Sequence, residues 1–331
     1  MDLVYQTKST GQTHRLPEFV RPARLLITMD IAQLEENFAI PGHLSFDQHD
    51  GLTRVQVQVA GASATIYLHG AHVTHWQPAE QKPVIFLSEK SDFAPGKAIR
   101  GGVPICFPWF GPRSDGQAGP SHGYARIQEW ELAFAALVPG EDGDQLYMTF
   151  ALYPNEVSSS MGFGSVRAAY EVIVGKTLTM RLTTVSIGTQ PLKIEEALHT
   201  YFAVKDVRTT RLTGLESALF RDKTDGMKEK TTPAGPLVLT GETDRVFPAN
   251  TATVQIHDDG NHRVITVEKT NSATTVVWNP WSELAVKLAD MADNAWPGFV
   301  CVETANTATD AITLKPGESH AMTCAVSVVT S

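Results

Sequence analysis

The feature that most constrains the fold is a hydrophobic alternation with a period of two, which recurs along nearly the whole chain. Val55, Val57 and Val59 alternate with Gln56 and Gln58, as in a strand that buries only one face. The same pattern returns over residues 146–152, 168–174, 178–183, 192–204, 264–268, 274–278 and 321–329. Turn clusters rich in Gly, Pro, Asp and Asn separate these runs. The pattern predicts an all-β, antiparallel sandwich.

One or two short helices are expected beside the strands. Asp30 and Gln33 have the D-x-x-Q spacing of a capping box, which predicts a helix over residues 31–38. A second helix is predicted over residues 283–291, with Ser282 as its N-cap. Two such helices are too short to form a layer, so the strands must build the core.

The strand pattern continues without a linker-like change in composition, which favours a single domain over residues 30–331. Residues 1–29 are polar and precede the pattern, so they are expected to be a poorly ordered extension, and Met29 is an alternative start. This extension lacks the apolar stretch of a signal peptide. A run of about 20 apolar residues, as a membrane helix needs, occurs nowhere in the chain.

The charge balance limits the partners. The 331 residues include 27 Lys+Arg against 36 Asp+Glu, a formal net charge of −9. This balance argues against nucleic acid and membrane surfaces as partners, since both attract clustered Lys and Arg. Average charge alone also disfavours an anionic small substrate. Sparse cysteines without a CxxC pattern indicate free thiols in a reducing compartment, the cytoplasm, and they are Cys106, Cys301 and Cys324.

The segment that begins at Arg100 is dense in Gly, Pro and aromatic residues, as in a rigid loop that carries function. Arg100 offers a planar fork suited to a phosphate or carboxylate group. Gly101 and Gly102 allow a ligand to approach the backbone closely, and their N–H groups are candidate donors. Trp109 and Phe110 are candidates for an apolar platform under a sugar ring. The alternative is a tight loop whose aromatic side chains fill the core.

Downstream, Ser121, His122 and Arg126 form a compact polar segment around a glycine. A histidine and an arginine four residues apart are the kind of polar groups that converge on a ligand. The alternative is an ordinary surface turn.

Three histidines at intervals of three, His69, His72 and His75, raise the question of a metal site. The flanking residues are typical of a strand, and a spacing of three places neighbouring side chains on opposite faces. Zinc ligands must converge. We therefore expect no metal here, with a metal-dependent hydrolase as the alternative.

Two residues in apolar strands are candidates for acid–base chemistry. Alternation places His199 on one strand face with Glu195, Ala197 and Tyr201, and a histidine titrates near neutral pH. Glu303 ends a very apolar strand, where burying a carboxylate is costly without a partner or a shifted pKa. The alternatives are a hydrogen-bonded core histidine and a structural ion pair.

Taken together, these segments resemble one family. The motifs R-G-G-V-P-I-C-F-P-W-F-G-P, H-G-Y-A-R, L-H-T-Y-F, D-R-V-F, W-N-P and V-C-V-E-T follow one another in that order. Six blocks in order are far more specific than any one of them. The chain from about Leu52 to its end is similar to the bacterial glucose-6-phosphate 1-epimerases, which are hexose-6-phosphate mutarotases of the aldose 1-epimerase superfamily.

The resemblance implies a large antiparallel β-supersandwich of the galactose mutarotase type and the interconversion of hexose 6-phosphate anomers by ring opening. In this chain it implies His199 as the general acid and Glu303 as the general base. It implies Arg100 and Arg126 as ligands of the sugar phosphate and Asp244 as a contact of the sugar. Proton transfer and bond rotation require no cofactor and no metal. The expected partner is a small sugar phosphate, and the expected state is a monomer.

One position departs from the family pattern. Some relatives use a glutamine immediately before H-G-[FY]-A-R for the substrate, where this chain has Ser121, with His122 next to it. Rival functions are a 1-epimerase of unphosphorylated aldoses and a non-catalytic carbohydrate-binding protein of the same fold. A Cys106 nucleophile is a weaker rival, since no paired base is evident.

Overall fold

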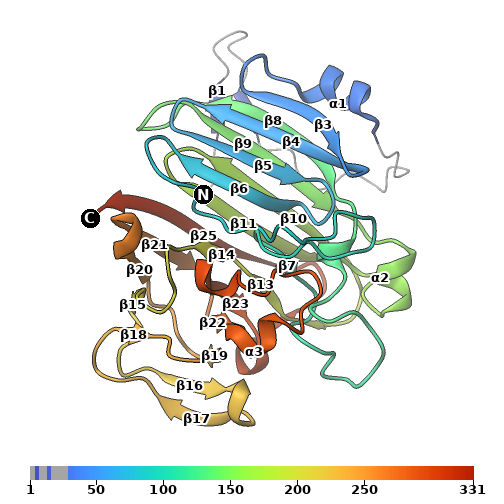
Figure 1. The fold of residues 1–331 in the computed structure, drawn as a ribbon. Coiled ribbons are helices and arrows are strands. Elements are labelled where there is room, and N and C mark those ends of the chain that lie inside the picture. Colours follow the sequence, from blue (N-terminus) through green and yellow to red (C-terminus); the bar gives the residue numbers. More distant parts are fainter. Residues whose placement is uncertain (1–3, 7–12, 16–28) are drawn as a thin grey trace.

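The computed structural model describes residues 4–6, 13–15 and 29–331. The chain folds mainly into antiparallel strands with a few short helices, which confirms the all-β prediction (Figure 1). The predicted extension over residues 1–29 lies mostly outside the described residues. Within it, β1 (Val4–Gln6) pairs antiparallel with β2 (Thr13–Arg15).

The described strands form two large sheets. The nine-stranded sheet has the spatial order β18 (Leu237–Val238), β15 (Arg211–Thr213), β20 (Val254–Asp258), β21 (Arg263–Thr270), β25 (Ser319–Thr330), β11 (Leu178–Ser186), β10 (Val166–Val174), β9 (Gln145–Leu152) and β8 (Glu131–Val138). The second large sheet has the order β17 (Lys228–Thr231), β16 (Leu219–Asp222), β19 (Thr243–Phe247), β22 (Thr274–Asn279), β23 (Phe299–Asn306), β13 (Glu196–Leu198) and β7 (Ile105–Cys106), and β14 (Tyr201–Ala203) also pairs with β23. We call this second sheet the site sheet.

A smaller sheet completes the layers. Its order is β3 (Leu44–His49), β4 (Leu52–Val59), β5 (Ala62–Tyr67) and β6 (His72–Pro78), and a separate pair is formed by β12 (Leu192–Ile194) and β24 (Ile312–Leu314). Figure 1 shows this four-stranded sheet beside β8, β9 and β10, while the site sheet lies toward the other end of the nine-stranded sheet. The four-stranded sheet and the site sheet thus cover the two ends of the nine-stranded sheet.

One apolar core runs through these layers. Val57 of the four-stranded sheet, Tyr170 of the nine-stranded sheet and Val302 of the site sheet belong to the same buried cluster. Trp76 of the four-stranded sheet is fully buried, and its indole N–H donates to the Gly175 carbonyl at 3.2 Å. The alternation seen in the sequence is therefore the alternation between this core and the opposite sheet faces.

The helices are short. Helix α1 (Ile31–Phe38) is capped by Asp30 and Gln33 in the expected capping box, which confirms that prediction. Helix α3 (Trp281–Ala285) follows Pro280, so the predicted Ser282 cap and the extent 283–291 were wrong. Helix α2 (Glu156–Ser160) was not predicted, because its five residues are too few for a visible period. Single 3-10 turns occur at η1 (Ala125–Ile127), η2 (Lys223–Asp225), η3 (Asp259–Asn261), η4 (Trp296–Gly298) and η5 (Ala308–Asp310).

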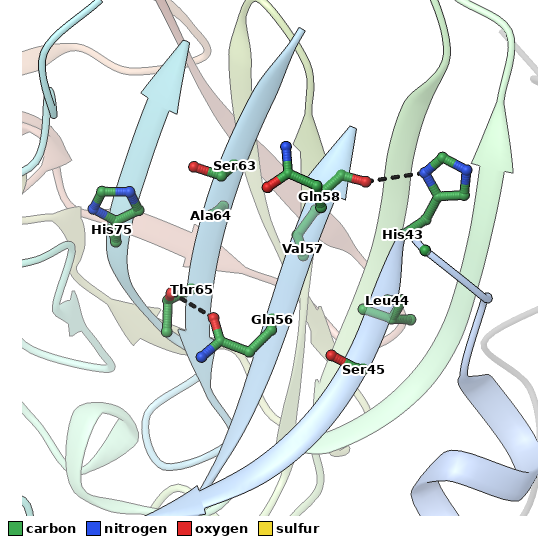
Figure 2. A pocket seen from close by; sticks show the side chains of 11 residues that line it. His43, Leu44, Ser45, Gln56, Val57, Gln58, Ser63, Ala64, Thr65 and His75 are labelled. Atoms are coloured by element: carbon green, nitrogen blue, oxygen red, sulfur yellow. Dashed lines mark hydrogen bonds between the residues drawn. The ribbon is translucent and has the colours of Figure 1, made fainter. Parts of the chain in front are cut away.

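The four-stranded sheet carries a polar hollow of about 460 Å³. Figure 2 shows that its side chains come from neighbouring strands and from the turn before β3, and they include His43, Ser45, Gln56, Gln58, Ser63, Thr65 and His75. Gln56 and Gln58 flank the buried Val57, so the hollow lies on the face that points away from the core. None of the predicted acid–base or phosphate-binding residues lines it.

Candidate active site

The candidate site lies on the face of the site sheet that points away from the main core. Strand β23 is buried along its whole length, and alternation puts Val300 and Val302 into the core. Glu303 therefore points to the opposite face, directly across from Val276 of β22. Glu303 is nevertheless only 1% exposed on this face.

His199 and Glu303 meet on this face. The distance from His199 Nε2 to Glu303 Oε1 is 3.4 Å. Burial lowers the pKa of His199 well below its usual 6.5 and raises the pKa of Glu303 well above 4.5. His199 Nδ1 and Glu303 Oε2 are buried without a hydrogen-bond partner. The arrangement suits a pair that exchanges a proton with a bound molecule.

Aromatic rings surround this pair. The His199 ring stacks on Tyr201 with centroids 4.9 Å apart, and the Trp278 ring meets its edge at 5.8 Å. Tyr201 in turn packs on Phe299 at 5.2 Å. These rings exclude water from the pair and provide an apolar wall that a sugar ring can contact.

Arg100 reaches the same wall. Its Nη1 donates to the Tyr201 hydroxyl at 3.2 Å, and its Nε donates to Asp290 Oδ1 at 3.1 Å. Tyr201 thus contacts both Arg100 and His199. Asp290 partly balances the charge of Arg100, and no pattern in the sequence indicated this ion pair.

The segment that follows residue 120 supplies two more polar groups. The Nη2 of Arg126 donates to the Ser121 carbonyl at 2.7 Å, while its Nε is buried without a partner. No carboxylate among the described residues forms an ion pair with Arg126. Ser121 is exposed at the edge of the site, and its part in the arrangement is this carbonyl.

His122 lies between Phe110 and His199. Its ring is 4.7 Å from the Phe110 ring and 5.8 Å from the His199 ring, measured between centroids. Its Nδ1 accepts the Gly111 N–H at 3.3 Å, so the proton of the neutral ring sits on Nε2. Burial, with help from the charge of Arg126, lowers the pKa of His122 to about 3. His122 is therefore a neutral hydrogen-bond donor.

Asp244 lies on the same face, opposite Trp278 in the pairing of β19 with β22. Lys223 forms an ion pair with it, with 2.8 Å between Nζ and Oδ2. Burial raises the pKa of Asp244, and Lys223 opposes that effect. The sequence interpretation missed Lys223, because a lysine in a short turn carries no pattern.

The glycines after Arg100 allow close packing against neighbouring protein atoms, whereas the sequence predicted close approach of a ligand. A Cβ on Gly102 would lie 2.3 Å from His72 Nε2, and a Cβ on Gly101 would lie 2.6 Å from the Phe86 carbonyl oxygen. The Gly102 N–H already donates to Phe86 at 2.7 Å. The prediction that the Gly102 N–H is a donor for a ligand was therefore wrong, and the absent side chains of both glycines leave room for neighbouring protein atoms.

The two aromatic residues of that loop differ. Trp109 is 4% exposed and donates its indole N–H to the Pro120 carbonyl at 2.9 Å, so it belongs to the core as the alternative reading had it. Phe110 is only partly buried and packs on His122. Phe110 alone therefore contributes to the site.

The three spaced histidines do not converge. His69 and His72 each bond a backbone carbonyl through Nε2, of Lys97 at 2.7 Å and of Gly101 at 2.8 Å, whereas His75 lines the polar hollow. The described part of the chain has no group of three or more His, Cys, Asp or Glu residues that could hold a metal ion.

The cysteines are free and buried. Burial raises the pKa of Cys106, which disfavours the thiolate a nucleophile needs. In the described residues, no helix has the length and apolar character to cross a membrane.

Comparisons with known proteins agree with this architecture. The model of the aldose 1-epimerase family matches residues 53–327. An Escherichia coli (strain K12) protein named "Putative glucose-6-phosphate 1-epimerase" is 36% identical over 262 residues, which cover 79% of this chain and 86% of that protein. The crystal structure of a "putative mutarotase (YeaD)" from Salmonella typhimurium has a TM-score of 0.82 at 32% identity, covering 89% of this chain and 96% of that one.

More distant structures show the fold alone. A galactose mutarotase-like protein from Clostridium acetobutylicum is 13% identical with a TM-score of 0.63, covering 87% of this chain and 98% of that one. This likeness confirms the predicted galactose mutarotase-like sandwich. By its family match and its curated relatives, the chain belongs to the aldose 1-epimerase family.

Proposed function

We propose that this protein interconverts the α and β anomers of hexose 6-phosphates, with glucose 6-phosphate as the main substrate. The observation that carries the proposal is the buried contact of 3.4 Å between His199 and Glu303 on a face that cations surround. The names of the relatives that cover most of the chain support the same substrate class.

Ring opening needs a base at the C1 hydroxyl and an acid at the ring oxygen. Glu303 takes the hydroxyl proton while His199 protonates the ring oxygen, and the bond between C1 and the ring oxygen breaks to leave an open-chain aldehyde. Rotation about C1–C2 followed by the reverse transfers closes the ring as the other anomer. Both oxygens are bonded to C1, so the two reactive atoms must lie close together, as Nε2 and Oε1 do.

The charge state of the pair depends on the substrate. The positive charges of Arg126 and Arg100 help to depress the pKa of His199, after the larger effect of burial. A bound phosphate neutralises these cations and therefore favours imidazolium at His199, whereas the charge of Lys223 still helps to lower the pKa of Glu303. The substrate's own phosphate thus promotes protonation of His199, the general acid of ring opening.

The remaining polar groups would hold the sugar. Arg126 is the stronger phosphate ligand, because its charge has no acidic partner and its Nε is unsatisfied. Arg100, oriented by Asp290 and Tyr201, is the second. Asp244 accepts bonds from ring hydroxyls, and His122 donates through Nε2. Ser121 is too exposed to contribute more than a rim contact.

We also propose that residues 30–331 act as one domain, as a monomer, in the cytoplasm. The apolar core that joins all three main sheets supports the single domain. Buried free thiols suit a reducing compartment.

The test is anomer exchange measured by NMR for glucose 6-phosphate and for glucose. The proposal predicts faster exchange of the phosphorylated sugar. Equal rates would favour an aldose 1-epimerase of unphosphorylated sugars. Saturable binding without exchange would favour a carbohydrate-binding protein.

A further inference from the structure

Lys223 sits where the edge of the site sheet meets the candidate site. It opens the turn η2, immediately after β16 ends at Asp222. Asp222 pairs with Arg245, so the next residue on each side of this pair lies on the opposite sheet face. That face holds Asp244, and the Lys223 ammonium group lies 2.8 Å from its carboxylate.

The ion pair continues a row of side chains that leads to the reacting groups. Asp244 lies opposite Trp278, and the Trp278 ring is 5.8 Å from the His199 ring. Lys223 Nζ also lies 5.6 Å from the centroid of Phe110, whose ring contacts His122. Lys223 therefore contacts Asp244 on one side of the site and Phe110 on the other, and its charge also helps to lower the pKa of Glu303.

The partial burial of Asp244 makes its ion pair with Lys223 important for its charge state. The Asp244 side chain is 21% exposed, and the Lys223 side chain is 34% exposed. A carboxylate in such surroundings is drawn toward its protonated form, and a cation in contact with it favours ionisation. An ionised carboxylate accepts hydrogen bonds only, whereas a protonated one also donates.

We propose that Lys223 is a positioning residue of the sugar site, where its ion pair fixes Asp244 as a hydrogen-bond acceptor for hydroxyl groups of the substrate ring. This inference rests on the proposed function. It concerns the sugar ring and leaves the phosphate to Arg100 and Arg126.

The first experiment is a double-mutant cycle on the full chain with glucose 6-phosphate. Lys223→Met is expected to lower kcat/KM about tenfold, equivalent to ~1.4 kcal/mol, mainly through KM. In an Asp244→Asn background the same change is expected to cost less than about twofold, because the carboxylate it acts on is gone. Lys223→Arg should restore most of the loss.

The matched control is Lys228→Met in the same hairpin. Lys228 is 69% exposed and pairs with Asp225, away from Asp244. This variant should retain wild-type kinetics. An equal loss from Lys223→Met with and without Asp244 would overturn the inference and indicate that Lys223 acts on the substrate or on Glu303 directly. Unchanged kinetics in Lys223→Met would overturn it as well. Lys223→Gln serves if the methionine variant does not fold.

A second readout does not depend on catalysis. In protein labelled with ¹³C at aspartate carboxyl groups, the signal lost in Asp244→Asn identifies Asp244. Its pKa should be higher in Lys223→Met than in the wild type, since burial raises this pKa and Lys223 lowers it. The same pKa in both proteins would refute the inference. Absence of anomer exchange in the wild type would instead refute the proposed function and leave the titration result standing.

Discussion

Replacing Arg126 with alanine tests most sharply the proposal that this residue binds the sugar phosphate. The guanidinium group has one bond, to the Ser121 carbonyl, and a buried Nε without a partner. Because no described carboxylate pairs with it, its removal leaves no buried anion behind. The variant should therefore fold normally, and its largest loss should be in the binding of an anionic ligand.

The size of the loss follows from the hydrogen bonds available. A hydrogen bond to a charged group contributes about 1.5–3 kcal/mol, which corresponds to roughly 10–150-fold in kcat/KM for glucose 6-phosphate. Free glucose offers no phosphate, so its exchange rate should change less than about threefold, within the range of a lost neutral contact. Arg126→Ala is thus expected to slow the exchange of glucose 6-phosphate far more than that of glucose.

The assay is NMR anomer exchange for both sugars at one ionic strength, with Arg181→Ala as the control. Arg181 lies on the nine-stranded sheet, is 45% exposed and pairs with Glu171, so its loss should leave both rates unchanged. An equal fall on glucose and glucose 6-phosphate in Arg126→Ala would refute the phosphate assignment.

Two further predictions concern stability. Burial depresses the pKa of His199, so below pH 6.5 the unfolded chain binds a proton at this residue that the folded chain does not bind. The free energy of unfolding therefore falls as the pH drops below 6.5. His199→Asn should reduce that slope by up to ~1.4 kcal/mol per pH unit in urea unfolding between pH 5 and 6.5; parallel slopes would contradict the assignment. Gly102→Ala should destabilise by more than the ~1–3 kcal/mol of its positive φ alone, because its Cβ would meet His72. Gly42→Ala, with φ +77° and open space, isolates the backbone cost, and equal losses for the two variants would rule out the clash.

The sequence allowed prediction of the features that depend on neighbours along the chain. The alternation around Val57 gives β4, and Asp30 with Gln33 gives the cap of α1. Such signals need only the period of a strand or the spacing of a turn. The predicted second helix began at the wrong residue because Pro280, with its fixed φ, starts α3 instead.

Features set by strand register were beyond the sequence. The pairing that puts Asp244 beside Trp278 joins two strands that do not follow one another in the chain. The contact of Arg100 with Asp290 joins two loop residues far apart in the sequence. Glu195 was expected beside His199, yet its carboxylate instead accepts the N–H groups of Phe110 and Ala308 and so ties two loops together. Only the folded chain shows this.

The net charge of −9 also acquires a local meaning. Arg126, Lys223 and Arg100 all lie close enough to His122 for their charges to depress its pKa. Three cationic side chains therefore gather at one site of a protein with a negative net charge, since net charge describes an average and binding depends on the local field.

His199 and Glu303 are proposed to catalyse anomer exchange of glucose 6-phosphate. The most direct measurement is the exchange rate between its two anomers by two-dimensional NMR, with wild-type protein and with Glu303→Gln. The amide keeps the shape of the side chain but cannot take the C1 hydroxyl proton, so the catalysed rate should fall by about 10²–10⁴-fold while the protein stays folded. Exchange at near the wild-type rate in folded Glu303→Gln would contradict the claim.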